Sequence, residues 1–199
     1  MKAIFLSASV PDPRRNPKYH SSADLVAIRD AVRALAAVVL PHATLYWGGH
    51  PAITPLISVV ARSTDLTGED RVRVYQSEWF PAEQRPTEND DFERVVLTPR
   101  RETLEESLYV MRESMLSAAP FEAAIFIGGM EGVEEEFDSF RRINPKAAVL
   151  PVASTGGAAG LLFKRERQRL GLSDDLLSEY AYPTLFRRHL RLPTVPGAG

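Results

Sequence analysis

The chain contains no cysteine among its 199 residues. This absence excludes a disulfide framework, thiolate metal ligands and a cysteine nucleophile, and it suits a reducing cytoplasm. Apolar runs as long as a bilayer-spanning helix, about 20 residues, are also missing. The N-terminus has one lysine and only a short apolar stretch before Pro11, too little for a signal peptide. We therefore expect a cytoplasmic protein without a membrane segment.

The chain also lacks an excess of charge of either sign. It has 24 basic and 26 acidic residues, a formal net charge of -2, so no overall field attracts duplex nucleic acid or an anionic membrane. Its four histidines are scattered, and no acidic pair has metal-ligand spacing. We expect no bound metal and no resident cofactor.

Apolar residues make up 44% of the chain, enough for one sizeable core and most simply a single domain. Several short apolar runs have apolar residues at successive positions, which is typical of strands buried on both faces of a parallel sheet. The predicted strands are Ala3–Leu6, Ala43–Trp47, Val72–Tyr75, Ala123–Ile127 and Ala147–Val152.

Segments with apolar residues at helical spacing alternate with these runs, for example Leu104, Leu108, Met111 and Met115. The alternation predicts an α/β fold, a single Rossmann-like domain with a mostly parallel sheet of five or more strands flanked by helices. Residues 1–165 would form this domain. Residues 166–199 would form a C-terminal helical extension packed on it.

Two regions interrupt the alternation. The charged, proline-containing segment Gln76–Pro99 holds one possible edge strand, Arg94–Leu97, and a connection of this length is usually a functional lid or a disordered excursion. From Gly157 onward we expect two helices and a frayed tail. Residues Lys164–Arg191 carry seven basic and four acidic residues, which indicates a solvated helix face or, less often, a partner or phosphate surface.

Glycine pairs follow two of the predicted strands: Gly48 and Gly49 after the second, and Gly128 and Gly129 after the fourth. In an open parallel sheet, ligands bind beyond the carboxyl ends of the strands, where helix N-termini present free N–H groups. Small or hydroxylic residues end two more strands. They are Ser7 and Ser9 after the first strand, and Ser154 and Thr155 after the fifth.

The four strand ends suggest one shared crevice, although each feature has a simpler explanation. A glycine pair can be a turn that needs positive φ, and His50 can be an ordinary loop residue, since His50–Ile53 would precede a helix capped by Thr54 with Pro55 at its first position. Glu134, Glu135 and Glu136 can simply favour a helix N-terminus. We expect three aromatic residues to serve packing and not base stacking: Trp47, Trp79 and Phe80.

Three stretches together resemble the SLOG superfamily: "FLSASVP", "YWGGHPAITPLI" and "IFIGGMEGVEEEF". The resemblance covers about residues 2–165. This Rossmann-like superfamily includes the Lonely-guy phosphoribohydrolases, DNA-processing protein A, and sensor domains of TRPM channels and bacterial defence systems. It implies a nucleotide or nucleotide-derived ligand.

The third stretch is similar to the hydrolase signature Pro-Gly-Gly-x-Gly-Thr-x-x-Glu, but it departs from it. Ile127 stands in place of the proline, and Val133 in place of the threonine whose hydroxyl would bind phosphate or ribose. Two residues, Met130 and Glu131, separate glycines where the signature has one. Glu136 takes the place of the signature glutamate.

These departures rank binding above catalysis. The first hypothesis is a module that senses a nucleotide-derived signal, ADP-ribose-like or cyclic, with backbone N–H groups holding phosphate and hydroxyls and glutamates contacting ribose. The expected ligand-binding residues are Ser7, Ser9, Gly48, Gly49, His50, Gly128, Gly129, Met130, Glu131, Gly132, Ser154 and Thr155. A sensor of this kind implies an effector protein in trans, and the resemblance implies a homo-oligomer.

Two alternatives stay open. The first is a nucleoside-monophosphate N-glycosidase, with Glu136 and Glu135 as the catalytic carboxyls. No matching catalytic arginine motif is recognisable, but Arg100, Arg101 or Arg112 could be supplied from the helix before the fourth predicted strand. The second alternative is single-strand DNA binding by the basic C-terminal helices, which the near-neutral charge places last.

Overall fold

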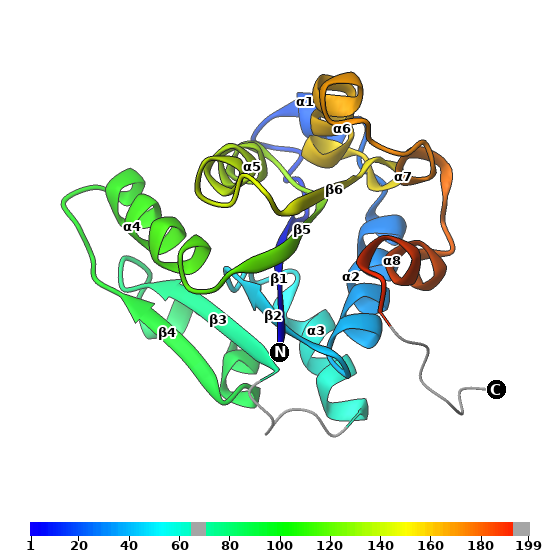
Figure 1. The fold of residues 1–199 in the computed structure, drawn as a ribbon. Helices are drawn as coiled ribbons and strands as arrows, with labels where there is room; N and C mark the ends of the chain where they lie inside the picture. The colour runs from blue at the N-terminus through cyan, green and yellow to red at the C-terminus, as the bar shows by residue number, and fades with distance from the viewer. Residues whose placement is uncertain (65–70, 193–199) are drawn as a thin grey trace.

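A computed structural model describes residues 1–64 and 71–192. Its centre is a six-stranded parallel sheet with strand order β4-β3-β2-β1-β5-β6 (Figure 1). The strands are β1 (Lys2–Ser9), β2 (Ala43–Trp47), β3 (Val72–Ser77), β4 (Arg94–Thr98), β5 (Phe121–Gly128) and β6 (Ala148–Val152). The predicted Rossmann-like α/β fold is thus confirmed, including the edge strand at Arg94.

Helices cover both faces of the sheet (Figure 1). One face packs against α2 (Leu25–Val39), α3 (Thr54–Ser63) and α8 (Tyr182–Leu190), the other against α4 (Leu104–Leu116), α5 (Glu131–Ile143) and α6 (Gly157–Leu170). This double cover explains why β1, β2 and β5 are apolar at successive positions.

The C-terminal region differs in detail from the prediction. The second expected helix is two helices, α7 (Asp175–Ser178) and α8, because Pro183 lacks the N–H that an interior position needs and sits in the first turn of α8. The division predicted at residue 165 falls inside α6. Leu185 and Phe186 of α8 belong to the same buried core as α2. The predicted frayed tail lies outside the described residues.

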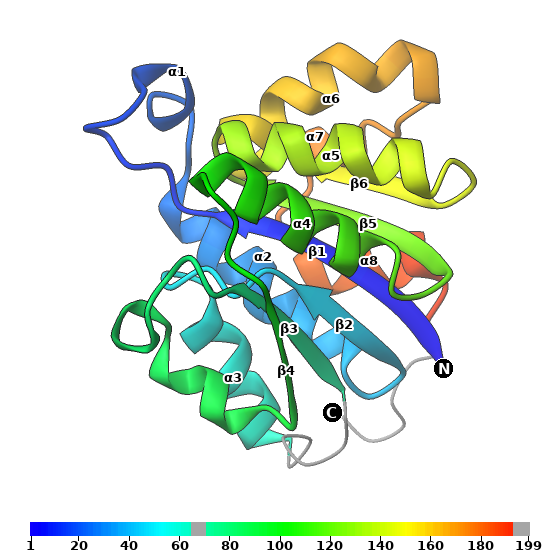
Figure 2. The same ribbon diagram turned by 90° about the vertical axis from the view of Figure 1, so that its left-hand side faces the viewer.

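The chain runs outward from β1 to β4 and then crosses back to β5, so the strand order reverses between β1 and β5. Ligands of open α/β sheets bind at such a reversal, beyond the carboxyl ends of the strands. Two long connections project beyond this same edge (Figure 2). One follows β1 and contains α1 (Pro17–His20), and the other joins β3 to β4.

The β3–β4 connection is built of two short 3-10 helices, η1 (Ala82–Gln84) and η2 (Thr87–Asp91), and is therefore not an unstructured excursion. It is attached to α3 through Asp91. The Ser58 hydroxyl donates a hydrogen bond to the Asp91 carboxylate, and Arg62 forms an ion pair with the same group at 3.6 Å. These two contacts attach the end of the connection to α3, beside the sheet edge.

Candidate functional site

A cavity of about 740 Å³ lies at the carboxyl ends of β1, β2, β3 and β5, beside α4 and α5. Small-molecule sites commonly have volumes of about 300 to 1,000 Å³. The cavity brings together most of the residues expected from the sequence: Ser9, Gly48, Gly49, His50, Met130, Glu131, Gly132, Glu135 and Glu136.

Glu136 is the most enclosed acidic side chain that lines this cavity, with 16% of its side chain exposed. The Ser7 hydroxyl donates a hydrogen bond of 2.6 Å to its Oε2, and Arg112 Nε lies 3.7 Å from its Oε1. Burial raises the pKa of Glu136, although the Arg112 charge and the Ser7 hydrogen bond act in the opposite direction. The carboxyl can thus change protonation state inside a ligand-sized space.

Of the three arginines considered in the sequence, Arg100, Arg101 and Arg112, Arg112 is the one that lines this cavity. Its Nη1 donates to Glu135 Oε2 at 2.5 Å, and only 14% of its side chain is exposed. Arg100, by contrast, lies over the ring of Trp79 at 4.4 Å. The sequence left the three arginines undecided, yet Arg112 is four positions after Leu108, which also lines the cavity, and residues at this spacing share one helix face.

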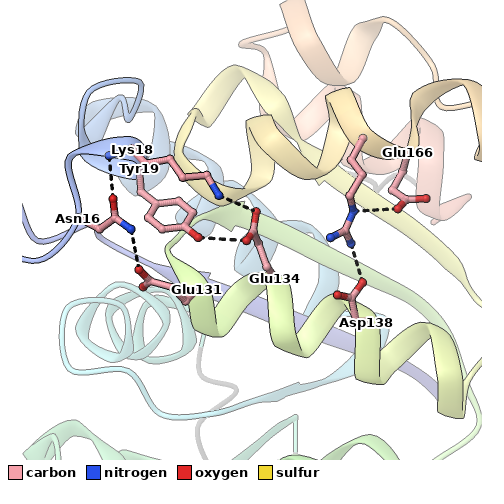
Figure 3. Close-up of polar contacts among 8 residues, drawn as sticks. Asn16, Lys18, Tyr19, Glu131, Glu134, Asp138 and Glu166 are labelled. Carbon is pink, nitrogen blue, oxygen red and sulfur yellow. Dashed lines mark hydrogen bonds and ion pairs between the residues drawn. The ribbon is translucent and has the colours of Figure 1, made fainter.

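Two other glutamates of α5 hold the connection that follows β1 (Figure 3). Glu131 accepts a hydrogen bond from Asn16 Nδ2 at 3.0 Å and has Arg15 Nη2 at 3.7 Å. Glu134 accepts one from the Tyr19 hydroxyl, also at 3.0 Å. Sequence reasoning missed this attachment, because "PDPRRNPKYHSS" has no apolar periodicity to reveal a packing partner.

Gly128 and Gly129 shape the backbone and do not bind through it. Both have positive φ, 57° and 85°, which glycine adopts at little cost. The Gly128 N–H donates to Thr155 Oγ1 and the Gly129 N–H to the Ser9 carbonyl. A Cβ on Gly129 would lie 2.3 Å from Val133 Cγ2. The Gly129 N–H is thus already paired within the protein, and neither Gly128 nor Gly129 lines the cavity.

Gly48 and Gly49 line the cavity with backbone alone. Gln76 Nε2 donates to the carbonyls of Gly48 at 3.1 Å and Gly49 at 2.9 Å, so this loop is held by β3. Gly49 has a φ of 64°, and a Cβ there would meet Gln76 Nε2 at 1.8 Å. A Cβ on Gly48 would lie 3.7 Å from Met111 Cε and 4.0 Å from Glu136 Oε1. A side chain at position 48 would therefore contact Met111 and Glu136, which line the same cavity.

Ser154 and Thr155 are not brought to the cavity. The Ser154 hydroxyl donates to the Glu179 carbonyl at 3.1 Å, and the Thr155 hydroxyl donates to the Val152 carbonyl at 2.6 Å. Both residues are buried. Their hydroxyls fix the turn after β6, a role that a strand-end position alone does not distinguish from ligand binding.

A scan against protein-family models matches the SLOG cluster3 family over residues 18–190. The chain belongs to the SLOG cluster3 family. The match covers the chain from α1 to α8, confirming the superfamily resemblance seen in three short stretches. Membership associates the chain with nucleotide-related binding or processing. A search of curated proteins finds no relative that matches this SLOG chain.

His50 of this SLOG protein borders the cavity with its backbone held in place. Its Nδ1 accepts a hydrogen bond from the Ala52 N–H at 3.2 Å, and its carbonyl accepts one from the Thr54 hydroxyl at 3.1 Å. Burial and the nearby Arg15 charge lower the pKa of His50. Thr54 is the first residue of α3 with Ile53 at the N-cap, so its predicted capping role is wrong by one position.

The three aromatic residues considered in the sequence occupy different environments. Trp47 is 1% exposed and belongs to the core, whereas Trp79 packs against Arg100. Phe80 lines the cavity.

Within residues 1–64 and 71–192 of the SLOG chain, no group of three or more acidic or histidine side chains could hold a metal ion. None of the helices in these residues has the length and apolar character of a membrane span.

Proposed function

We propose that the cavity binds a nucleotide-derived ligand, and that the protein acts as a sensor of that ligand. The observation that carries the proposal is the cluster of Ser7, Arg112 and Glu136, which are buried or nearly so and belong to the strand-order reversal between β1 and β5. Hydroxyl and carboxyl groups at such a position suit the hydroxyls of a ribose.

The parts of the cavity suit different parts of a nucleotide. Glu136, oriented by the Ser7 hydroxyl, would hydrogen-bond ribose hydroxyls, while the first-turn N–H groups of α5, near Gly132, and the Arg15 guanidinium would favour a phosphate. Candidate signals are ADP-ribose-like or cyclic. The protein would act as a homo-oligomer, and ligand binding would change its interaction with a separate effector protein.

The first test is a thermal-shift panel with AMP, NAD, ADP-ribose, cyclic ADP-ribose isomers and cyclic dinucleotides. A ligand at about 100 times its dissociation constant adds roughly 2.7 kcal/mol to stability, which raises Tm by about 5 to 10 °C for a chain of this size. Such a shift with at least one compound supports the proposal. An unchanged Tm throughout the panel contradicts it.

A second candidate function is hydrolysis of the N-glycosidic bond of a nucleoside monophosphate. One observation favours it: a buried carboxyl of raised pKa, Glu136, lies beside the Arg112 guanidinium, an arrangement that can protonate or stabilise a leaving group. Val133 argues against it, because it supplies no hydroxyl where the hydrolase signature has one.

Chromatography of free base after long incubation with nucleoside monophosphates and NAD separates the two functions. For a sensor, neither the wild type nor Glu136→Gln releases base, and the substitution changes affinity by only about 1 to 2 kcal/mol. For a hydrolase, the wild type releases base in excess over enzyme, and Glu136→Gln slows this about 10²- to 10⁴-fold. We expect no release.

Single-strand DNA binding has less support, because many of the basic C-terminal side chains have acidic partners. Arg165 contacts Asp138 at 2.6 Å and Glu166 at 2.9 Å, the two carboxylates labelled on the right of Figure 3. Similar pairs join Arg167 to Asp174 and Arg188 to Asp175. Backbone phosphates would have to displace these carboxylates.

A further inference from the structure

The two ends of the cavity differ in chemistry. The end near β5 is lined by charged side chains, Asp12, Arg15 and Glu131. The end near β3 is lined by Phe80 and Pro86 of the β3–β4 connection and by apolar side chains of α4, together with the uncharged polar residues Gln76, Ser77 and Gln84. The first turn of α4 follows β4, the neighbour of β3 in the sheet. A ligand with one charged and one uncharged end would therefore bind in a single direction.

Phe80 is held in place by its own backbone contacts. Its N–H donates to the Ser77 carbonyl at 3.2 Å, and its carbonyl accepts two hydrogen bonds from Arg85, from Nη2 at 2.8 Å and Nε at 3.1 Å. The preceding residue, Trp79, is covered by Arg100. Because these hydrogen bonds already hold the backbone of Phe80, ligand binding would cost little backbone entropy at this position.

The Phe80 ring is available to a ligand. It is partly exposed and lines the cavity, and none of the aromatic ring pairs found in the described part of the chain includes it. Planar bases stack on aromatic side chains largely regardless of base identity, since every base presents a π-face.

The sequence favoured a packing role for Phe80, but its place in the cavity points to another. We infer that Phe80 is the platform on which the planar base of the ligand stacks, so that the base lies at the β3 end and the ribose at Glu136. The inference rests on the proposed function and adds the orientation of the ligand. It assigns to the β3–β4 connection a role in selecting compounds that carry a base over those with a sugar phosphate alone.

Isothermal titration calorimetry tests this assignment with the nucleotides named above and with ribose 5-phosphate, which has no base. The variants are Phe80→Ala, Phe80→Tyr and Tyr109→Ala, the last being a matched control because Tyr109 is an exposed aromatic on α4 outside this cavity. Phe80→Ala should weaken binding of the best nucleotide about 5- to 100-fold. Ribose 5-phosphate binding should not change.

Phe80→Tyr should restore most of the nucleotide affinity, and Tyr109→Ala should bind like the wild type. If the wild type binds a nucleotide and Phe80→Ala binds it equally well, or if Phe80→Ala weakens both probes to the same extent, the stacking inference is overturned while the proposed function stands. If the wild type binds none of the nucleotides, the proposed function fails, and the inference fails with it.

Discussion

The Ser7 hydroxyl, at the end of β1, donates a 2.6 Å hydrogen bond to Glu136 of α5, 129 positions later in the chain. The bond fixes one carboxylate oxygen, while the other oxygen, Oε1, lies 3.7 Å from Arg112 Nε and would lie 4.0 Å from a Cβ on Gly48. A carboxyl held in this way is oriented for contacts with a ligand, and its burial gives it a measurable effect on stability.

Glu136→Gln should alter how stability depends on pH. Burial raises the folded-state pKa of Glu136 above its ordinary value of 4.5. The contribution of Glu136 to stability is therefore complete below pH 4.5 and is lost as the pH rises through the folded-state pKa. The variant cannot ionise here and should avoid that loss. Urea unfolding from pH 4 to 8 should show its advantage growing with pH, whereas parallel curves would contradict this.

Gly129→Ala should destabilise the fold without any ligand present. Its φ of 85° strains an alanine, and the new Cβ would meet Val133 Cγ2 at 2.3 Å. We expect the free energy of unfolding to fall by about 1 to 3 kcal/mol from strain, with a further loss from overpacking. Gly132→Ala is the matched control, since its Cβ would lie 3.3 Å from the movable end of Arg112. Equal stabilities in urea would contradict the assignment.

Tyr19→Phe tests the attachment of the segment after β1 to α5. Tyr19 is 2% exposed and donates to Glu134, so the loss of its hydroxyl should cost about 1 to 3 kcal/mol in chemical denaturation. An unchanged free energy of unfolding would mean that the hydrogen bond is not formed in solution.

The same substitution has a signature at high pH. Two effects raise the pKa of Tyr19 from 10.0 to about 12, of which desolvation is the larger and the hydrogen bond to Glu134 the next. The stability that depends on its protonated hydroxyl is complete below pH 10 and is lost between about pH 10 and 12. The wild type should therefore lose up to about 1.4 kcal/mol per pH unit more than Tyr19→Phe in this window. In a pH titration followed by tyrosine absorbance, the variant should lack the one phenol that ionises near pH 12 in the wild type.

The strands and their order of appearance could be predicted because a strand covered on both faces must be apolar at successive positions, as in β5. The glycine pairs likewise marked true strand ends. The reason for each glycine could not be predicted. Gly129 leaves room for Val133, and Gly49 leaves room for the Gln76 amide. Both are glycines because of local packing, and in the sequence such a glycine looks the same as one that contacts a ligand.

Contacts between side chains that are far apart in the chain could not be predicted from the sequence. Ser7 and Thr155 are both hydroxyl residues at strand ends, yet one contacts Glu136 in the cavity and the other closes a turn through Val152. The direction of a side chain at a strand end depends on backbone angles that residue type does not reveal. The division of the α5 glutamates between the segment after β1 and Arg112 had no local signal either.

The central claim is that a nucleotide-derived ligand occupies the cavity beside Glu136, and calorimetric titration of Gly48→Leu tests it most directly. Gly48 is not among the glycines with positive φ, and a Cβ there would make ordinary van der Waals contact, 3.7 Å from Met111 Cε and 4.0 Å from Glu136 Oε1. The first carbon of a leucine therefore fits, the rest of the side chain would occupy ligand space beside Glu136, and the Tm without ligand checks that the variant is folded. We predict that the wild type binds at least one nucleotide of the panel and that Gly48→Leu binds it at least about 100-fold more weakly, a difference of about 2.7 kcal/mol. Equal affinity in the two proteins would place the ligand elsewhere and contradict the account.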